Sequence, residues 1–182
     1  MYKKMTGNVM LAILFVLAIT LTLAGQKCKV SAESSSIPVT AVYCAGEFTV
    51  ALKNYGTVWT WGRNDYGQLG IGNTVDQLTP VQLTGFSDIA VIVAGGWHSM
   101  AIKNDCSLWT WGMNSYGQLG DESYIQKNTP VQVTRISEVI AVDAGSNVTV
   151  TLKGDHTVWS CGFNVYGQLG DGTNASKNYP VQ

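Results

Sequence analysis

The stretch WTWGRNDYGQLG, which spans Trp59–Gly70, occurs in three versions in this chain of 182 residues. It returns as WTWGMNSYGQLG at Trp109–Gly120 and as WSCGFNVYGQLG at Trp159–Gly170, fifty residues apart each time. Three copies in register indicate that one structural unit of about fifty residues is built several times.

The residues around each copy predict four β-strands per unit. Large apolar residues alternate with small or polar ones along residues 48–53, 98–103 and 148–153, which is typical of a strand. A turn and a second strand follow at residues 58–61, 108–111 and 158–161, so each unit contains a β-hairpin. A strand that opens with Pro-Val-Gln, as at residues 80–82, and an apolar strand such as Ile89–Val93 complete the unit. This pattern, without helical periodicity after residue 32, predicts an all-β fold made of β-propeller blades.

The motif itself has a structural explanation. Trp59 and Trp61 are two residues apart and therefore project from the same face of one strand. A single four-stranded sheet cannot cover that face, so we expect a neighbouring blade to do so. The asparagine of G-x-N-x-YGQLG can bond local backbone groups, and we expect Leu69, Leu119 and Leu169 to hold the loop in place. Gly56, Cys106 and His156 close equivalent hairpin turns, and we predict a positive φ at all three.

Residues 94–120, AGGWHSMAIKNDCSLWTWGMNSYGQLG, resemble the repeat of the RCC1 (regulator of chromosome condensation) family. The similarity extends from about residue 36 to the end of the chain. It implies a propeller, and members of the family are described as seven-bladed. Some eukaryotic members act as guanine-nucleotide exchange factors and bind chromatin, and secreted bacterial members include inhibitors of β-lactamases. The resemblance therefore implies the fold and does not select one function.

The number of repeats predicts an incomplete ring. Within the array 33–182 we distinguish a partial unit 36–55, repeats 56–105 and 106–155, and a partial unit 156–182. The first unit would lack its Pro-Val-Gln strand and the last would end within its own. Propellers typically close with about 4–8 blades. The chain would then be a fragment, a truncated product, or a protomer that self-associates or takes further repeats from another chain.

Residues 1–32 have the layout of a secretory signal peptide. Lys3 and Lys4 precede an apolar run at residues 9–24, and a polar segment ends in Val30-Ser31-Ala32, a suitable cleavage site. Cleavage would leave Glu33 as the first residue and place the protein outside the cell or on its surface. The alternative is an uncleaved membrane anchor, although the apolar run is shorter than the about 20 residues of a spanning helix.

Charge and cysteine content exclude several classes of function. Four of the 11 lysines and arginines and none of the 12 acidic residues lie in residues 1–32, which leaves a net charge of −5. An acidic chain argues against a nucleic-acid partner. The remaining cysteines, Cys44, Cys106 and Cys161, show no metal-ligand spacing, so we expect no metal or cofactor. One disulfide with a free thiol and three separate thiols both remain open.

Neither histidine has the neighbours of a catalytic residue. His98 occupies a column that holds Phe48 and Val148 in the other units, so we expect a buried, hydrogen-bonded side chain. His156 lies in a turn and should face solvent. No acid or nucleophile has a defined spacing from either one, and we predict a protein without catalytic residues.

A binding surface must lie in the columns where the units differ. Trp97 shares a column with Glu47 and Asn147 and is the one tryptophan that the repeat does not require. It is either an exposed aromatic contact for a partner or a ring packed under a neighbouring loop. The candidate binding residues are Trp97, Arg63, Asp65 and Met113. We predict a secreted, non-catalytic protein-binding module, with an exchange-factor-type regulator of a small GTPase, or a fragment of a larger propeller, as alternatives.

Overall fold

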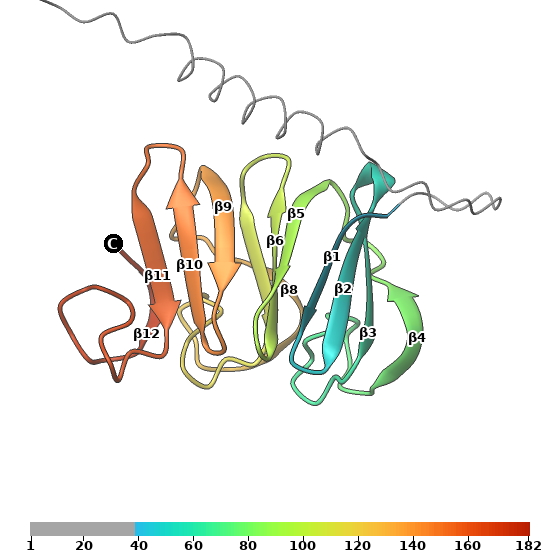
Figure 1. Cartoon of the computed structure of the whole chain (residues 1–182), viewed down its shortest axis with the longest axis horizontal. Helices are drawn as coiled ribbons and strands as arrows, with labels where there is room; N and C mark the ends of the chain where they lie inside the picture. The colour runs from blue at the N-terminus through green and yellow to red at the C-terminus, as the bar shows by residue number, and fades with distance from the viewer. Residues whose placement is uncertain (1–38) are drawn as a thin grey trace, which may run out of the picture. The chain divides into compact units, whose positions relative to one another are not determined.

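The computed structural model describes residues 39–182, which form three four-stranded antiparallel sheets (Figure 1). Blade 1 contains β1 (Val39–Ala45), β2 (Phe48–Lys53), β3 (Thr57–Gly62) and β4 (Gln77–Gln82), with a 3₁₀ turn at Asn54–Gly56. Blade 2 contains β5 (Ile89–Ala94), β6 (His98–Lys103), β7 (Leu108–Gly112) and β8 (Lys127–Gln132). Blade 3 contains β9 (Val139–Ala144), β10 (Val148–Lys153), β11 (Val158–Gly162) and β12 (Lys177–Val181). In each sheet the strands pair in chain order, which confirms the all-β, propeller-type prediction. The signal peptide predicted at residues 1–32 and its cleavage before Glu33 lie outside the described residues.

The blades do not coincide with the sequence units. Unit 56–105 contains β3 and β4 of blade 1 together with β5 and β6 of blade 2. The partial unit 36–55 supplies β1 and β2 of blade 1, and the partial unit 156–182 supplies β11 and β12 of blade 3. The end units are partial as sequence units, but the blades that they help to build have four strands each, because β4 pairs with β3 and β12 pairs with β11. All three blades are complete, and no strand pairing within residues 39–182 joins blade 3 to blade 1.

The hydrophobic core lies between the blades. Val50, Leu52 and Val58 of blade 1 are buried in one cluster with Ile92 and Trp111 of blade 2. Met100, Ile102 and Leu108 of blade 2 form the equivalent cluster with Val139 and Val142 of blade 3. Blade 2 therefore covers an apolar face of blade 1, and blade 3 covers an apolar face of blade 2.

Trp111 shows what the tryptophans of the motif do. Its ring is fully buried, and its indole N–H donates a hydrogen bond of 2.9 Å to the backbone carbonyl of Gln68 in blade 1. Burial of about 200 Å² contributes up to about 5 kcal/mol. The prediction that a neighbouring blade covers the tryptophan face is confirmed here.

The loop of each motif is organised by its asparagine. Asn114 is completely buried; its Oδ1 accepts from the Leu119 amide at 3.0 Å, and its Nδ2 donates to the Ser123 and Ile125 carbonyls at 3.0 and 3.2 Å. Asn64 and Asn164 make the same pattern of bonds. Leu69, Leu119 and Leu169 are buried beneath their loops. The predicted roles of both residue types are confirmed.

The predicted backbone conformation of the hairpin turns is also confirmed. The φ angles of Gly56, Cys106 and His156 are 69°, 64° and 65°. This left-handed region suits glycine and is strained for other residues. Two of the three turns thus hold a side chain in a conformation that glycine adopts without strain.

Candidate functional site

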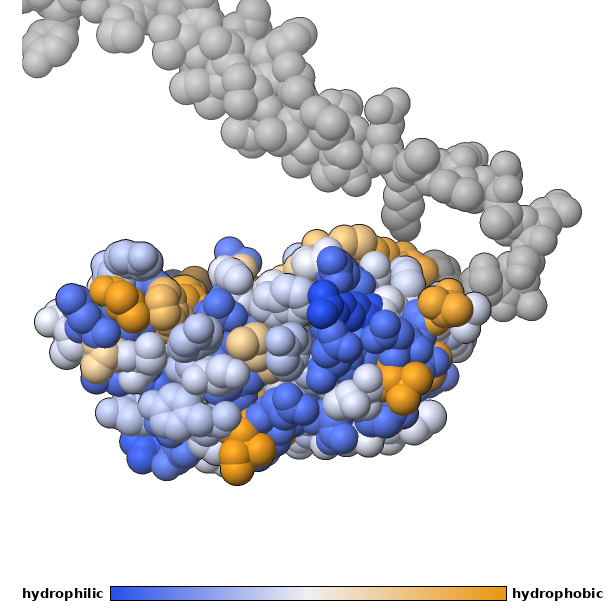
Figure 2. Space-filling view, turned by 90° about the horizontal axis from the view of Figure 1, so that it is seen from below, coloured by the Kyte–Doolittle hydropathy of each residue, from blue (hydrophilic) through white to orange (hydrophobic). Residues whose placement is uncertain are grey.

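The residues at two of the positions where the repeat units differ lie together at one end of the three sheets. The backbone amides of Arg63, Met113 and Phe163 each donate a 2.9 Å hydrogen bond to the carbonyl of the residue that precedes β2, β6 or β10. Those residues are Glu47, Trp97 and Asn147. We call this end of the sheets, with the loops 63–76, 113–126 and 163–176, the loop face. Figure 2 looks onto this end of the molecule and shows a mostly hydrophilic surface with scattered apolar side chains.

Arg63 is the centre of a charged and aromatic cluster on the loop face. Its Nη1 lies 2.7 Å from Glu47 Oε2, and its Nε lies 2.5 Å from Asp65 Oδ2. The guanidinium carbon is 5.0 Å from the centroid of the Trp97 ring. Trp97 belongs to blade 2, so this cation–π contact bridges two blades.

The two carboxylates fix the charge and orientation of the guanidinium. Hydrogen bonds to Glu47 and then to Asp65 raise the pKa of Arg63 above its usual value. The Arg63 side chain is 37% exposed, and those of Glu47 and Asp65 are more exposed. Isolated surface ion pairs contribute little to stability, but here two of them hold the guanidinium over one aromatic ring. The result is a cation and an aromatic ring presented together to solvent.

The structure brings the four predicted binding residues to one place. Arg63 packs on Trp97, Asp65 binds Arg63, and the amide of Met113 bonds to the Trp97 carbonyl. Trp97 and Met113 are half-buried. The Trp97 ring makes an edge contact with Tyr66, at 5.7 Å between centroids, in the loop of blade 1. The ring therefore packs against a neighbouring loop on one side, which is the alternative that the sequence left open.

Two members of this cluster were missed by the sequence reasoning. Glu47 stands in the same variable column as Trp97, and that column was the signal that could have identified it. Tyr66 belongs to the shared YGQLG motif and was therefore assigned to structure alone. Its contact with Trp97 arises only because blade 2 lies beside blade 1.

A second aromatic cluster occupies the same level of the loop face at the next junction. Phe163, in the column of Arg63, makes edge contacts with Tyr116 of blade 2 at 4.8 Å and with Tyr166 at 6.2 Å. Tyr166 is 87% exposed. Aromatic side chains thus line both blade junctions on this face.

His98 is completely buried between blades 2 and 3. Its Nε2 lies 3.0 Å from Thr149 Oγ1, and the Thr149 hydroxyl itself donates to the Gln118 carbonyl at 2.7 Å. Nε2–H is therefore the donor to Thr149, and Nδ1 is buried with no hydrogen-bond partner among residues 39–182. Burial lowers the pKa of His98 to about 4, so the imidazole is neutral at pH 7. The prediction of a buried, hydrogen-bonded histidine is confirmed, and the predicted exposure of His156 is confirmed as well.

The three cysteines within residues 39–182 are separate thiols: Cys44 is exposed, Cys106 is half-buried and Cys161 is buried. Burial raises the pKa of Cys161 to about 12, which makes it a weak nucleophile. Within residues 39–182, no three His, Cys, Asp or Glu side chains gather as metal ligands would. The described part of the chain also has no helix with the length and apolar character needed to cross a membrane.

Curated relatives match this chain over short stretches. The ultraviolet-B receptor UVR8 of Arabidopsis thaliana is 38% identical over 61 residues, which cover 33% of this chain and 14% of the receptor. The mitochondrial RCC1 domain-containing protein RUG3 of the same plant is 31% identical over 67 residues, or 36% of this chain and 15% of that protein. The chain thus spans a small part of these relatives.

Solved structures match over most of the described blades. Human WBSCR16 superposes with a TM-score of 0.71 at 24% identity, over 82% of this chain and 38% of that one. Prp20p of Saccharomyces cerevisiae gives 0.71 at 21% identity, over 79% of this chain and 37% of that one. Both likenesses concern the fold.

The profile of the "Regulator of chromosome condensation (RCC1) repeat" matches residues 55–102, 105–152 and 155–182. A second profile of the same repeat matches residues 39–68 and 89–118. The matched segments cover most of the chain and contain the tryptophan strands and asparagine loops described above. On this basis the chain belongs to the RCC1 repeat family.

Proposed function

We propose that this protein is an exported, non-catalytic binding module that contacts a protein partner through its loop face. The observation that carries the proposal is the Arg63–Trp97 cluster. The shared columns of the repeat are used by the fold, whereas Arg63, Glu47 and Trp97 stand in columns that the repeat leaves free. Tryptophan and arginine are enriched among the residues that contribute most to protein–protein binding.

The chemistry of the face supports a protein rather than a nucleic acid as the partner. Arg63 is already neutralised by Glu47 and Asp65, and the chain after residue 32 carries a net charge of −5. A phosphate backbone would need a surplus of positive charge. An aromatic ring beside a guanidinium whose charge is already balanced suits a peptide surface with apolar and neutral polar side chains.

Related structures provide a precedent for this mode of action. Prp20p of Saccharomyces cerevisiae binds Gsp1p and histones, and yeast RCC1 (Prp20) has also been crystallised with Kap60 bound to it. That protein thus binds protein partners, and this chain shares part of its fold. Export rests on the signal-like residues 1–32.

Affinity capture with matched variants tests the proposal. The exported chain is immobilised, a retained protein is identified and purified, and its affinity is measured by calorimetry. Trp97→Ala should weaken binding by about tenfold or more, as expected for a central aromatic contact. Tyr55→Ala is the control, because Tyr55 is 87% exposed in the β2–β3 turn at the opposite end of blade 1. Unchanged affinity of Trp97→Ala, or an equal loss with Tyr55→Ala, would contradict the loop face as the binding surface.

A further inference from the structure

The chain makes the same contact between blades twice. In the first, the Gln68 carbonyl of blade 1 accepts hydrogen bonds from Ser99 at 2.8 Å and from the Trp111 indole at 2.9 Å. In the second, the Gln118 carbonyl of blade 2 accepts from Thr149 at 2.7 Å and from the Cys161 thiol at 3.6 Å. Each blade therefore has an acceptor face, which carries the glutamine carbonyl, and a donor face, which carries the hydroxyl and the tryptophan or cysteine.

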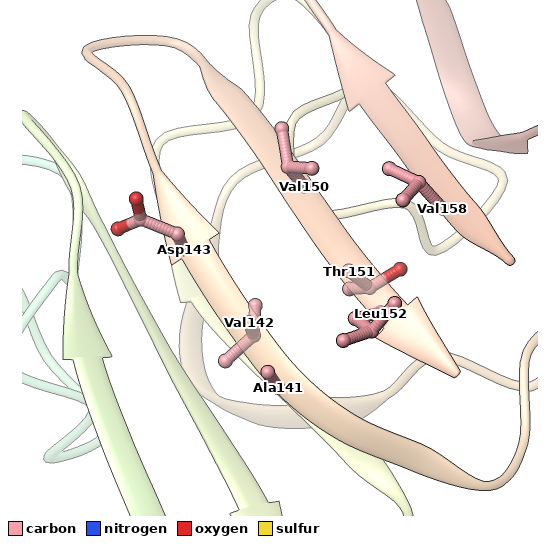
Figure 3. A pocket seen from close by; sticks show the side chains of 7 residues that line it. All are labelled: Ala141, Val142, Asp143, Val150, Thr151, Leu152 and Val158. Atoms are coloured by element: carbon pink, nitrogen blue, oxygen red, sulfur yellow. The ribbon is translucent and has the colours of Figure 1, made fainter. Parts of the chain in front are cut away.

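Blade 3 presents an acceptor face that no other described blade covers. Its Val150, Leu152 and Val158 occupy the positions of Val50, Leu52 and Val58, which blade 2 buries. In blade 3, Val158 is 55% exposed. Together with Ala141 and Asp143 of β9, these side chains line a pocket on the outer surface of the sheet (Figure 3).

The last glycine of the motif loop has a similar positive φ in all three blades, but in blade 3 no other described blade lies against it. A Cβ on Gly70 would lie 2.7 Å from the Trp111 indole nitrogen, and one on Gly120 would lie 3.0 Å from the Cys161 sulfur. A Cβ on the equivalent Gly170 would meet nothing within 4 Å among the described residues. The space that a tryptophan or cysteine of the next blade fills elsewhere is open here.

Blade 1 presents the matching donor face. Thr49 and Trp61 stand in the positions of Ser99 and Trp111, and Trp61 is only half-buried. Leu78 of β4 stands in the position of Asn128, whose carbonyl accepts from the Gly72 amide of the preceding blade. Leu78 is an apolar side chain that is 96% exposed.

We propose that the acceptor face of blade 3 binds the donor face of blade 1 of a second copy of this chain, head to tail. Gln168 would accept hydrogen bonds from Thr49 and Trp61 of that copy, and Val150, Leu152 and Val158 would pack against its tryptophans. The two internal contacts supply the geometry, and every copy carries both faces.

A mixing experiment with two variants of the full chain tests the assembly. Val158→Lys blocks the acceptor face, and Trp61→Lys blocks the donor face. Each change should weaken self-association by about tenfold or more, because the equivalent Val58 and Trp111 are fully buried at the internal contact and a lysine charge there would be buried without a partner. An equimolar mixture should associate again as a heterodimer, since one intact face of each kind remains. Tyr55→Lys, at neither face, is the control and should associate like the unaltered chain.

Sedimentation equilibrium at micromolar concentrations gives the result. The proposal is overturned if the unaltered chain is a monomer, or if either variant self-associates as strongly as the unaltered chain. It is also overturned if a mixture of folded variants stays monomeric. Circular dichroism verifies folding, and Val158→Thr with Trp61→Gln replaces the first pair if either lysine variant is unfolded. If each variant of that second pair self-associates as strongly as the unaltered chain, the proposal is overturned.

Discussion

His98 should make the stability of this protein depend on pH between about 7 and 5. The neutral ring is buried between blades 2 and 3, donates from Nε2 to Thr149 and has an unpartnered Nδ1. The added proton would sit on Nδ1, where no acceptor in the described part of the chain receives it. Acid should therefore favour the unfolded chain, in which the ring is hydrated.

The sign and size follow from the lowered pKa. The folded pKa of His98 is about 4, against 6.5 for the free side chain. The stabilising contribution is fully present above pH 6.5 and is lost as the pH falls toward 4. Between about pH 7 and about pH 5 the free energy of unfolding should fall by about 2 kcal/mol.

Urea denaturation at the two pH values measures this loss directly. His98→Phe is the matched variant, because Phe48 occupies the same column in blade 1 and is buried there. It should remove the dependence on pH while leaving partner binding intact. The carboxyl groups of Asp105, Glu122, Asp155 and Asp171, whose pKa values are lowered, contribute mainly below about pH 5. An equal loss of stability in the unaltered chain and in His98→Phe would refute the reasoning.

The remaining predictions concern the turns, the loops and the N-terminus. Cys106→Gly should leave the free energy of unfolding unchanged or raise it by up to about 1 kcal/mol, because the residue has a positive φ. Gly56→Val should lower it by about 2 kcal/mol or more, since a Cβ there would lie 2.7 Å from the Ile89 amide nitrogen; chemical denaturation measures both, and a stabilising Gly56→Val would contradict the account. Asn114→Ala should cost about 3 kcal/mol because buried backbone groups lose their partners, whereas Asn104→Ala in an exposed turn should change little; equal effects in a thermal melt would count against it. N-terminal sequencing of the exported protein should find Glu33 first, and recovery of intact residues 1–32 in the membrane fraction would exclude cleavage.

The sequence determined the features that depend on neighbouring residues. The period of fifty residues, the alternation along residues 48–53 and the Asn loops identify strands, turns and the repeat family. The positive φ at Cys106 and His156 was predictable because glycine occupies the same turn position in the first unit. Such features are local, since strand alternation and turn conformation are set within a few residues.

The tertiary structure decided which surfaces meet. The sequence units do not show where one blade ends, because each unit divides its strands between two sheets. Arg63 and Trp97 are far apart in the chain and form one cluster only because blade 2 packs beside blade 1. The unpartnered Nδ1 of His98 likewise depends on blade 3 excluding water from the junction. These properties come from packing between sheets, and hydrophobic periodicity within one strand does not specify which neighbour will cover it.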